Sequence, residues 1–287
     1  MDCIALGING LTKRHRDFTL DSVSFSIPRG TVVGFIGENG AGKSTTLKTI
    51  LGLMTKDAGT ISICGKLEEN VDFATRNKIG VVFDGNNYPN KYTPKQLSSL
   101  LENVYISWDK EKYFSMLDKL SLPVNRRIKA FSKGMKAKLA IIVALSQSPD
   151  LLIMDEPTSG LDPVMRDDIL NILLDFVRDE KHSILISSHI TSDLEKIADY
   201  IVFIHNGKVI FNKSQNELKN QYGIMKCNAA QFEEIDKEDV LYYRKQSNKW
   251  DVLIADKDTV QKKYPNVQIV PADIDDIMLF YIKGERL

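Results

Sequence analysis

The segment Gly37-Glu-Asn-Gly-Ala-Gly-Lys43-Ser44 constrains this 287-residue chain more than any other feature. It matches the phosphate-loop pattern GxxxxGK[ST], in which glycines let backbone amides converge on an anion. A β-rich run over residues 31–36 precedes it, and an apolar-periodic helix over 43–54 follows it. That helix points its positive end at the loop, which favours a bound anion. Lys43 can then reach the terminal phosphates, and the Ser44 hydroxyl can ligate Mg²⁺. The alternative is a flexible turn with an incidental lysine, and the strand–loop–helix context favours the phosphate site.

Two carboxylates follow an apolar run at residues 151–154, namely Asp155 and Glu156. A buried strand that ends in acids is where α/β sheets place ligand chemistry. We expect Asp155 to hold Mg²⁺, directly or through water, and Glu156 to polarise the attacking water. Taken alone, the pair is equally consistent with a cap at the end of a strand.

The chain up to about residue 215 is predicted to be one α/β unit, because short β-rich runs alternate with helical patterns. Thr93 and Pro94 look like an N-cap and a first helical position, and the helical pattern continues to about Leu122. With a second helix over 134–146, this predicts a helical insertion over about 86–148. The other elements expected before residue 215 are strands at 4–9, 23–27, 60–64, 79–83, 151–154, 183–187 and 200–204, and a helix at 163–178.

After residue 215 the character of the sequence changes. The runs 240–243 and 250–254 predict a hairpin, and 273–283 predicts a closing helix. We expect residues 216–287 to form a small α+β accessory domain, and no catalytic motif falls in it.

Composition excludes several classes. Lysine plus arginine (38) equals aspartate plus glutamate (38), which gives no case for wholesale nucleic-acid binding. Cys3, Cys64 and Cys227 are far apart without a CxxC spacing, so a disulfide framework or zinc site is not expected. The longest strongly apolar run, residues 139–145, is far shorter than the ~20 residues of a membrane helix, and the N-terminus lacks signal-peptide features. We therefore expect a cytoplasmic protein, with any membrane spanning done by another chain.

The order of motifs is more specific than the phosphate loop. Phe131-Ser-Lys-Gly-Met135 comes after that loop, then the strand with its two carboxylates, then Ser159-Gly-Leu-Asp162, then Ser187-Ser-His189. Over residues 1–215 the chain resembles the nucleotide-binding subunit of ABC transporters. The resemblance implies an α/β fold, a P-loop NTPase (ABC ATPase) core with a β-rich N-terminal subdomain and a helical insertion. The sequence also lacks an Asn-Lys-x-Asp guanine-reading motif, which argues against a GTPase.

The resemblance assigns roles to particular residues. It implies that Lys43, Glu156 and His189 are catalytic, with His189 sensing the γ-phosphate. Ser132 and Gly134 would contact the ATP held by a second subunit, and Asp162 would lie at the dimer interface; from the residues alone, Ser132 and Asp162 are simply helix N-caps. The loop expected to hold ATP comprises Gly37, Glu38, Asn39, Gly40, Ala41, Gly42, Lys43, Ser44 and Thr45.

Several positions depart from the family pattern. Lys133 and Met135 replace the usual Gly and Gln of the signature, while its Ser and second Gly are kept. Asp84 occupies the position of a glutamine that links Mg²⁺ to the membrane partner, and it is either a metal contact or a turn-forming residue. His15 matches the adenine-stacking tyrosine, Phe18 is the nearest aromatic, and the sequence does not choose between them.

Two other features have plain interpretations. Residues 126–138 hold six basic residues and no acid, which favours a solvated face over a surface that guides anions. Four aromatic residues lie in the region that contacts the permease in the family that the chain resembles, namely Tyr88, Tyr92, Tyr105 and Trp108. We expect most of them to pack within the helical insertion.

The expected function is ATP binding and hydrolysis with Mg²⁺, in which two ATPase subunits close and reopen to drive separate transmembrane permease subunits. No nucleic-acid partner is expected, and the chain would sit peripherally on the inner face of the cell membrane. In the detail of its motifs the sequence most resembles bacterial ATPase subunits whose permeases are encoded separately. Many of those transporters are exporters. A soluble ABC ATPase acting on DNA or ribosomes is disfavoured by the single phosphate loop and the absence of heptads or CxxC. An ATP-gated regulatory module stays open because of Asp84 and the altered signature.

Overall fold

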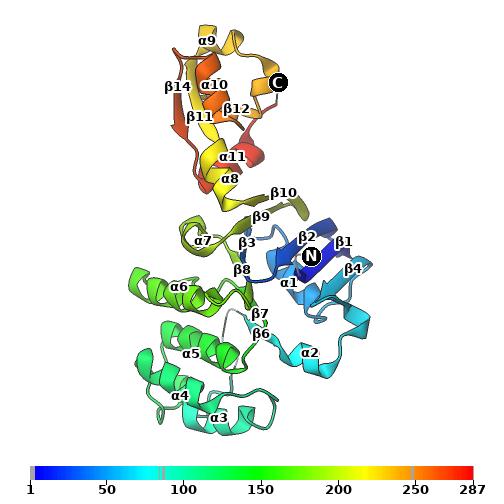
Figure 1. Ribbon diagram of the computed structural model, residues 1–287, viewed down its shortest axis with the longest axis vertical. Helices are drawn as coiled ribbons and strands as arrows, with labels where there is room; N and C mark the ends of the chain where they lie inside the picture. The colour runs from blue at the N-terminus through cyan, green and yellow to red at the C-terminus, as the bar shows by residue number, and fades with distance from the viewer. Residues whose placement is uncertain (1–3, 84, 86–87, 247–248, 287) are drawn as a thin grey trace.

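The computed structural model describes residues 4–83, 85, 88–246 and 249–286. Its strands form three sheets (Figure 1): a six-stranded central sheet, a four-stranded sheet from the N-terminal part, and a four-stranded sheet near the C-terminus. The predicted α/β class, with a β-rich N-terminal part and inserted helices, is confirmed.

The central sheet has the strand order β10-β9-β3-β8-β7-β6. All neighbours in it are parallel except β10, which runs antiparallel to β9. Every residue of β3, β7 and β8 is buried, which explains why these strands read as continuous apolar runs. Parallel strands end at the same edge, and that edge is where the segments after β3, β7 and β8 meet. The strand bounds are β3 (Val32–Ile36), β6 (Ile79–Val82), β7 (Leu151–Asp155), β8 (Ser183–Ser188), β9 (Tyr200–His205) and β10 (Lys208–Ser214).

An antiparallel sheet with the order β2-β1-β4-β5 covers α1 (Lys43–Ile50). Its side chains share one hydrophobic cluster with Leu47 of that helix. The helix ends earlier than expected, because Gly52 follows its C-cap with φ of 71°. The strands are β1 (Ile4–Arg14), β2 (Thr19–Pro28), β4 (Ala58–Ile63) and β5 (Lys66–Leu67), followed by a 3₁₀ turn (Glu68–Asn70) and α2 (Phe73–Asn77).

The helices between β6 and β7 gather at one end of the molecule (Figure 1). Thr93 caps the first of them in a capping box with Gln96, as its sequence predicts. The expectation of continuous helical structure to residue 122 was wrong, because the chain leaves the helix after Leu101 and a new helix starts behind the N-cap Asp109. The elements here are α3 (Pro94–Leu101), α4 (Lys110–Lys119), a 3₁₀ turn (Ile128–Ala130) and α5 (Lys133–Ser146).

The helices at residues 163–177 and 191–197 belong to the hydrophobic cluster of the central sheet, and the segments after residue 214 form the third sheet and the helices beside it. The predicted hairpin is present as β12 and β13, with residues 247–248 outside the described part, while β11 and β14 were not expected. Ile277 and Phe280 of the closing helix pack in the same hydrophobic cluster as Phe203 of β9 and Phe211 of β10. The elements are α6 (Pro163–Val177), α7 (Thr191–Ile197), α8 (Gln215–Gln221), β11 (Gly223–Asn228), α9 (Ala229–Glu233), a 3₁₀ turn (Lys237–Asp239), β12 (Tyr242–Gln246), β13 (Lys249–Ile254), α10 (Lys257–Lys263), β14 (Gln268–Pro271) and α11 (Ile274–Lys283).

Candidate nucleotide site

The glycine-rich loop joins β3 to α1 and is shaped by what packs beneath it. A Cβ on Gly37 would lie 2.4 Å from the carbonyl oxygen of Ile204, so only glycine fits against β9 there. Gly42 has φ of 115°, and a Cβ on it would lie 2.9 Å from the ring of Phe18. The loop backbone is therefore held close to two neighbours that leave no room for side chains.

Lys43 spans this loop from the first position of α1. Its ammonium donates hydrogen bonds to the carbonyl oxygens of Gly37 at 2.7 Å and Glu38 at 3.3 Å. It also lies 3.3 Å from Oε1 of Glu156, and its side chain is 6% exposed. A positive charge and a helix N-terminus thus face the same space, which is an arrangement that binds anions.

The two predicted carboxylates lie at the end of β7, at the edge where the phosphate loop begins. Asp155 is buried, and its Oδ1 accepts a hydrogen bond of 2.6 Å from the Ser187 hydroxyl. Glu156 has φ of 51°, in the left-handed region that a non-glycine residue seldom adopts. Its backbone amide donates to the Ser187 carbonyl oxygen at 3.2 Å, which anchors this unusual backbone to β8.

His189 follows β8 and meets the carboxylate of Glu156. Its Nδ1 lies 2.5 Å from Glu156 Oε2, and its backbone amide donates to the same oxygen at 3.4 Å. The other oxygen, Oε1, is buried and accepts no hydrogen bond from a described residue, although the Lys43 ammonium lies beside it. Glu156 is therefore held between a lysine and a histidine, with one oxygen left available to a hydrogen-bond donor.

A cavity of about 570 Å³ lies over the phosphate loop and brings together most of the predicted nucleotide-binding residues. Gly37 and Ala41 belong to the loop but are buried beneath this cavity. Asp17 also lines it and was not predicted; the sequence offered no signal for it other than its place beside Phe18. The lining residues are His15, Asp17, Phe18, Glu38, Asn39, Gly40, Gly42, Lys43, Ser44, Thr45 and Glu156.

The signature residues and Asp162 lie apart from this cavity among the residues that the structure describes. Ser132 is the N-cap of α5 and accepts a hydrogen bond from the amide of Met135, and Asp162 is the N-cap of α6. A Cβ on Gly134 would lie 2.3 Å from the sulfur of Met165, so the starts of these two helices pack closely. One chain thus does not bring its own signature to its own phosphate loop.

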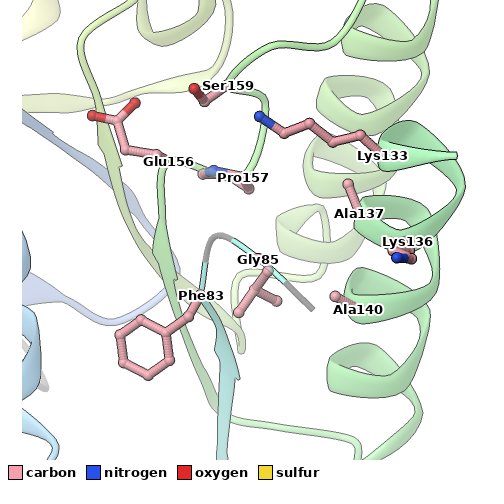
Figure 2. Close-up of a pocket in the computed structure, with 10 residues that line it drawn as sticks. Phe83, Gly85, Lys133, Lys136, Ala137, Ala140, Glu156, Pro157 and Ser159 are labelled. Atoms are coloured by element: carbon pink, nitrogen blue, oxygen red, sulfur yellow. The ribbon is translucent and has the colours of Figure 1, made fainter. Parts of the chain in front are cut away.

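A second cavity, of about 350 Å³, lies between α5 and the ends of β6 and β7 (Figure 2). Phe83 and Gly85 line it from the segment after β6, and Lys133 points into this region from α5, toward Ser159. Glu156 lines both this cavity and the one over the phosphate loop. Asp84 lies outside the described residues.

Most of the basic stretch is exposed, as expected, and most of the aromatic residues of the helical region pack inside it. Within residues 126–138, Lys138 differs from the solvated face that was expected, because it is buried and pairs with Asp168 at 2.9 Å. Tyr105 and Trp108 pack on the core of this region, whereas Tyr92 is 37% exposed. Tyr88 also packs there, and burial raises the pKa of its hydroxyl well above the usual value.

The fold and the geometry of this site together indicate one class of nucleotide-binding protein. A glycine-rich loop between a parallel strand and a helix, with a lysine at the helix start and carboxylates at the end of a neighbouring strand, is the architecture of a P-loop NTPase. No helix that could cross a membrane is found among the described residues.

Comparison with known proteins narrows this class to one family. Residues 20–159 match the family model described as "ABC transporter". The chain is 37% identical over 222 residues to the lantibiotic transport ATP-binding protein SrtF of Streptococcus pyogenes, covering 75% of this chain and 93% of the relative. It is 32% identical over 219 residues to the Nod factor export ATP-binding protein I of Ralstonia nicotianae, covering 74% and 68%.

A solved structure agrees with these sequence relatives. The chain superposes with a TM-score of 0.65 on cbiO1 from Clostridium perfringens, part of the ABC transporter complex cbiONQ, at 25% identity over 75% of this chain and 90% of that one. The chain belongs to the ATP-binding proteins of ABC transporters. The expectation of a nucleotide-binding transport ATPase is confirmed, and an ABC ATPase that acts on DNA or ribosomes is not favoured.

Proposed function

We propose that Glu156 is the residue that polarises water for attack on the γ-phosphate of ATP, with Lys43 and His189 as its partners. The observation that carries this proposal is the position of the Glu156 carboxylate, 3.3 Å from Lys43 Nζ and 2.5 Å from His189 Nδ1. When ATP enters, its phosphates compete with Glu156 for the lysine, which frees the carboxylate to accept a proton from water. His189 then holds the carboxylate in place at the edge of the cavity.

Ser44 and Asp155 are the residues that would hold Mg²⁺. Ser44 lines the cavity in the first turn of α1, and Asp155 is buried next to the same loop. Within the described residues no lysine, arginine or histidine pairs with Asp155, whose one partner is the Ser187 hydroxyl, so the buried charge is suited to a cation. When bound, Mg²⁺ neutralises phosphate charge that builds up during transfer. Asp84, which lies outside the described residues, remains a proposed further contact.

Adenine stacks on His15 in this proposal. Phe18 and His15 both line the cavity, but Phe18 is half-buried against the core and its ring packs on Gly42. His15 is exposed and has a free face for a flat purine. Phe18 thus supports the loop, while His15 contacts the base.

Two ATPase subunits are needed to complete each site. Ser132 and Asp162 are exposed at helix N-termini and lie away from the phosphate loop of their own chain. A second copy, or a similar chain, placed face to face would bring these donors to the ATP bound by its partner. In this arrangement residues 1–215 form the ATPase domain, with its helical subdomain at about 86–148, and residues 216–287 form an accessory domain.

The membrane part of the transporter is proposed to be a separate permease, so that the chain lies on the inner face of the cell membrane. The relatives named for lantibiotic transport and Nod factor export support an exporter-like role. The test is to tag the full chain in its native cells, extract membranes with mild detergent, and identify what co-purifies, with untagged cells as the control. Recovery of a polytopic membrane protein is the expected result. Recovery from the cytosol alone, with ribosomes, DNA or no partner, would contradict the assignment.

A further inference from the structure

His189 is positioned by a short helix that directly follows it. Helix α7 has seven residues, and its N-cap Ile190 provides no side-chain hydrogen bond to the first turn. Helices this short are marginal on their own, so the place of α7 is set by what packs around it. On the other side, the Ser188 hydroxyl accepts a hydrogen bond from the Ile190 amide at 2.9 Å. The contact of His189 with Glu156 therefore depends both on this bond from β8 and on the groups that hold α7.

The start of α7 is bonded to α11, the closing helix of the chain. The Thr191 hydroxyl donates a hydrogen bond of 2.8 Å to Oδ2 of Asp275, and Thr191 is 7% exposed. The backbone amide of Ile274 donates to Oε1 of Glu195 at 3.4 Å. Two contacts thus tie the beginning of α11 to the helix that follows His189.

The other end of α7 is held by α8. The Gln215 side-chain amide donates to the carbonyl oxygens of Glu195 at 2.7 Å and Leu194 at 3.3 Å. The Lys219 ammonium donates to the same Glu195 carbonyl at 3.3 Å. Since these carbonyls belong to the last turn of α7, residues that follow β10 hold both ends of the helix.

Contacts from α6 to α7 are weaker. Lys196 pairs with Asp167 at 2.9 Å, but both side chains are more than half exposed, and exposed ion pairs contribute little. Arg166 lies 3.7 Å from Asp193, which is beyond hydrogen-bond distance. The half-buried hydroxyl–carboxylate bond to α11 is therefore the shortest hydrogen bond that the described residues of another helix make to the start of α7.

We propose that the C-terminal residues set the position of His189 through the Thr191–Asp275 hydrogen bond, which makes Asp275 a positioning residue for ATP hydrolysis. This inference rests on the proposed role of His189. Movement of α11 away from α7 would release Thr191 and leave His189 held on one side only, by the bond between Ser188 and Ile190, and so slow hydrolysis while the phosphate loop still holds nucleotide. A change in the position of the C-terminal residues would then change the position of His189 relative to the Glu156 carboxylate.

Steady-state ATP hydrolysis by the purified full chain tests the proposal. Thr191→Val and Asp275→Ala are each expected to lower kcat about three- to tenfold with KM for ATP unchanged, since one half-buried hydrogen bond is lost. Thr191→Ser and Asp275→Asn keep a hydroxyl donor and an oxygen acceptor, and should restore most of the rate. The double variant Thr191→Val/Asp275→Ala should be no slower than either single variant.

The control is Asp276→Ala, which removes a carboxylate from the same turn of α11. No hydrogen bond from its side chain to α7 is found in the part of the chain that the structure describes. This control is expected to leave kcat within about twofold of the wild type. A loss as large as that of Asp275→Ala would overturn the proposal, because the effect would then be a general one on α11.

Hydrogen–deuterium exchange over residues 188–198 gives a readout that does not depend on turnover. Exchange there should be about fivefold faster in Asp275→Ala and Thr191→Val than in the wild type or Asp276→Ala. Unchanged exchange in both variants would show that α11 does not hold α7 and would overturn the inference. A wild-type chain without ATP hydrolysis would instead count against the proposed function, and the exchange data would still decide the role of Asp275.

Discussion

The ammonium of Lys43 lies 3.3 Å from Oε1 of Glu156, and this contact joins the phosphate loop to the end of β7. Lys43 belongs to the glycine-rich loop that is proposed to bind phosphate, whereas Glu156 follows a strand whose last residue, Asp155, is a buried carboxylate. In the proposed mechanism a bound phosphate and this carboxylate compete for one cation, so nucleotide binding would free the proposed catalytic base.

Replacing Lys43 should weaken nucleotide binding. Lys43→Met deletes the charge that faces the cavity, and we expect ATP affinity to fall about 10- to 100-fold, as for a lost charge-assisted hydrogen bond. Calorimetric titration with ATP measures this. Lys48→Met is the matched control, because Lys48 is exposed in the last turn of the same helix. Equal losses in the two variants would show that Lys43 has no special role.

Two glycines of the phosphate loop should respond differently to alanine. Gly37→Ala places a Cβ 2.4 Å from the Ile204 carbonyl oxygen, and we expect it to lower the free energy of unfolding by about 1–3 kcal/mol. Gly40 has φ of 84° with open space around it, so Gly40→Ala is expected to cost only about 1 kcal/mol, from backbone strain. Urea denaturation compares the two. The reverse order would mean that β9 does not pack on the loop as described.

Removal of the Ser187 hydroxyl should raise the Mg²⁺ concentration that ATP hydrolysis requires. It donates to Asp155 Oδ1 at 2.6 Å, so Ser187→Ala leaves this carboxylate less well oriented. We expect the Mg²⁺ concentration for half-maximal ATP hydrolysis to rise several-fold. Ser183→Ala is the control, since Ser183 is buried at the other end of β8 and accepts a hydrogen bond from Gly30 instead. An unchanged Mg²⁺ requirement in Ser187→Ala would argue against Asp155 as a metal ligand.

Cys227 should make stability depend on pH in alkaline solution. Burial, together with the charge of Asp251, raises the pKa of its thiol from 9.0 to about 11. Since the pKa is raised in the folded state, the thiol stabilises the fold below pH 9, and this contribution is lost as the pH rises toward about 11. The difference in unfolding free energy between the wild type and Cys227→Ala should therefore shrink over that window. A difference that stays constant with pH would contradict the shift.

The sequence was most informative where the chemistry is local. The phosphate loop and the carboxylates at the end of β7 are contiguous segments with a fixed geometry, so their placement around one cavity could be predicted before the fold was known. Helix ends were less predictable, because the apolar pattern after Pro94 continues past residue 101 while the chain turns and restarts at the Asp109 cap. A periodic pattern shows which face is buried but not where a loop interrupts it.

Long-range contacts could not be predicted. Thr191 and Asp275 are ordinary polar residues, and neither belongs to a pattern that indicates a partner. Their pairing follows from the way α11 returns to pack its apolar face on the central sheet, beside β9 and β10. The left-handed backbone at Glu156 was equally invisible, because nothing in the sequence around a non-glycine residue marks it.

The role of Glu156 is tested most directly by ATP hydrolysis by Glu156→Gln compared with the wild type, with ATP binding measured on the same preparations. The glutamine keeps the shape of the side chain but cannot accept the proton from water. We expect turnover to fall at least about 100-fold while ATP affinity stays the same or increases. Turnover close to that of the wild type would contradict this role, because another residue would then activate the water.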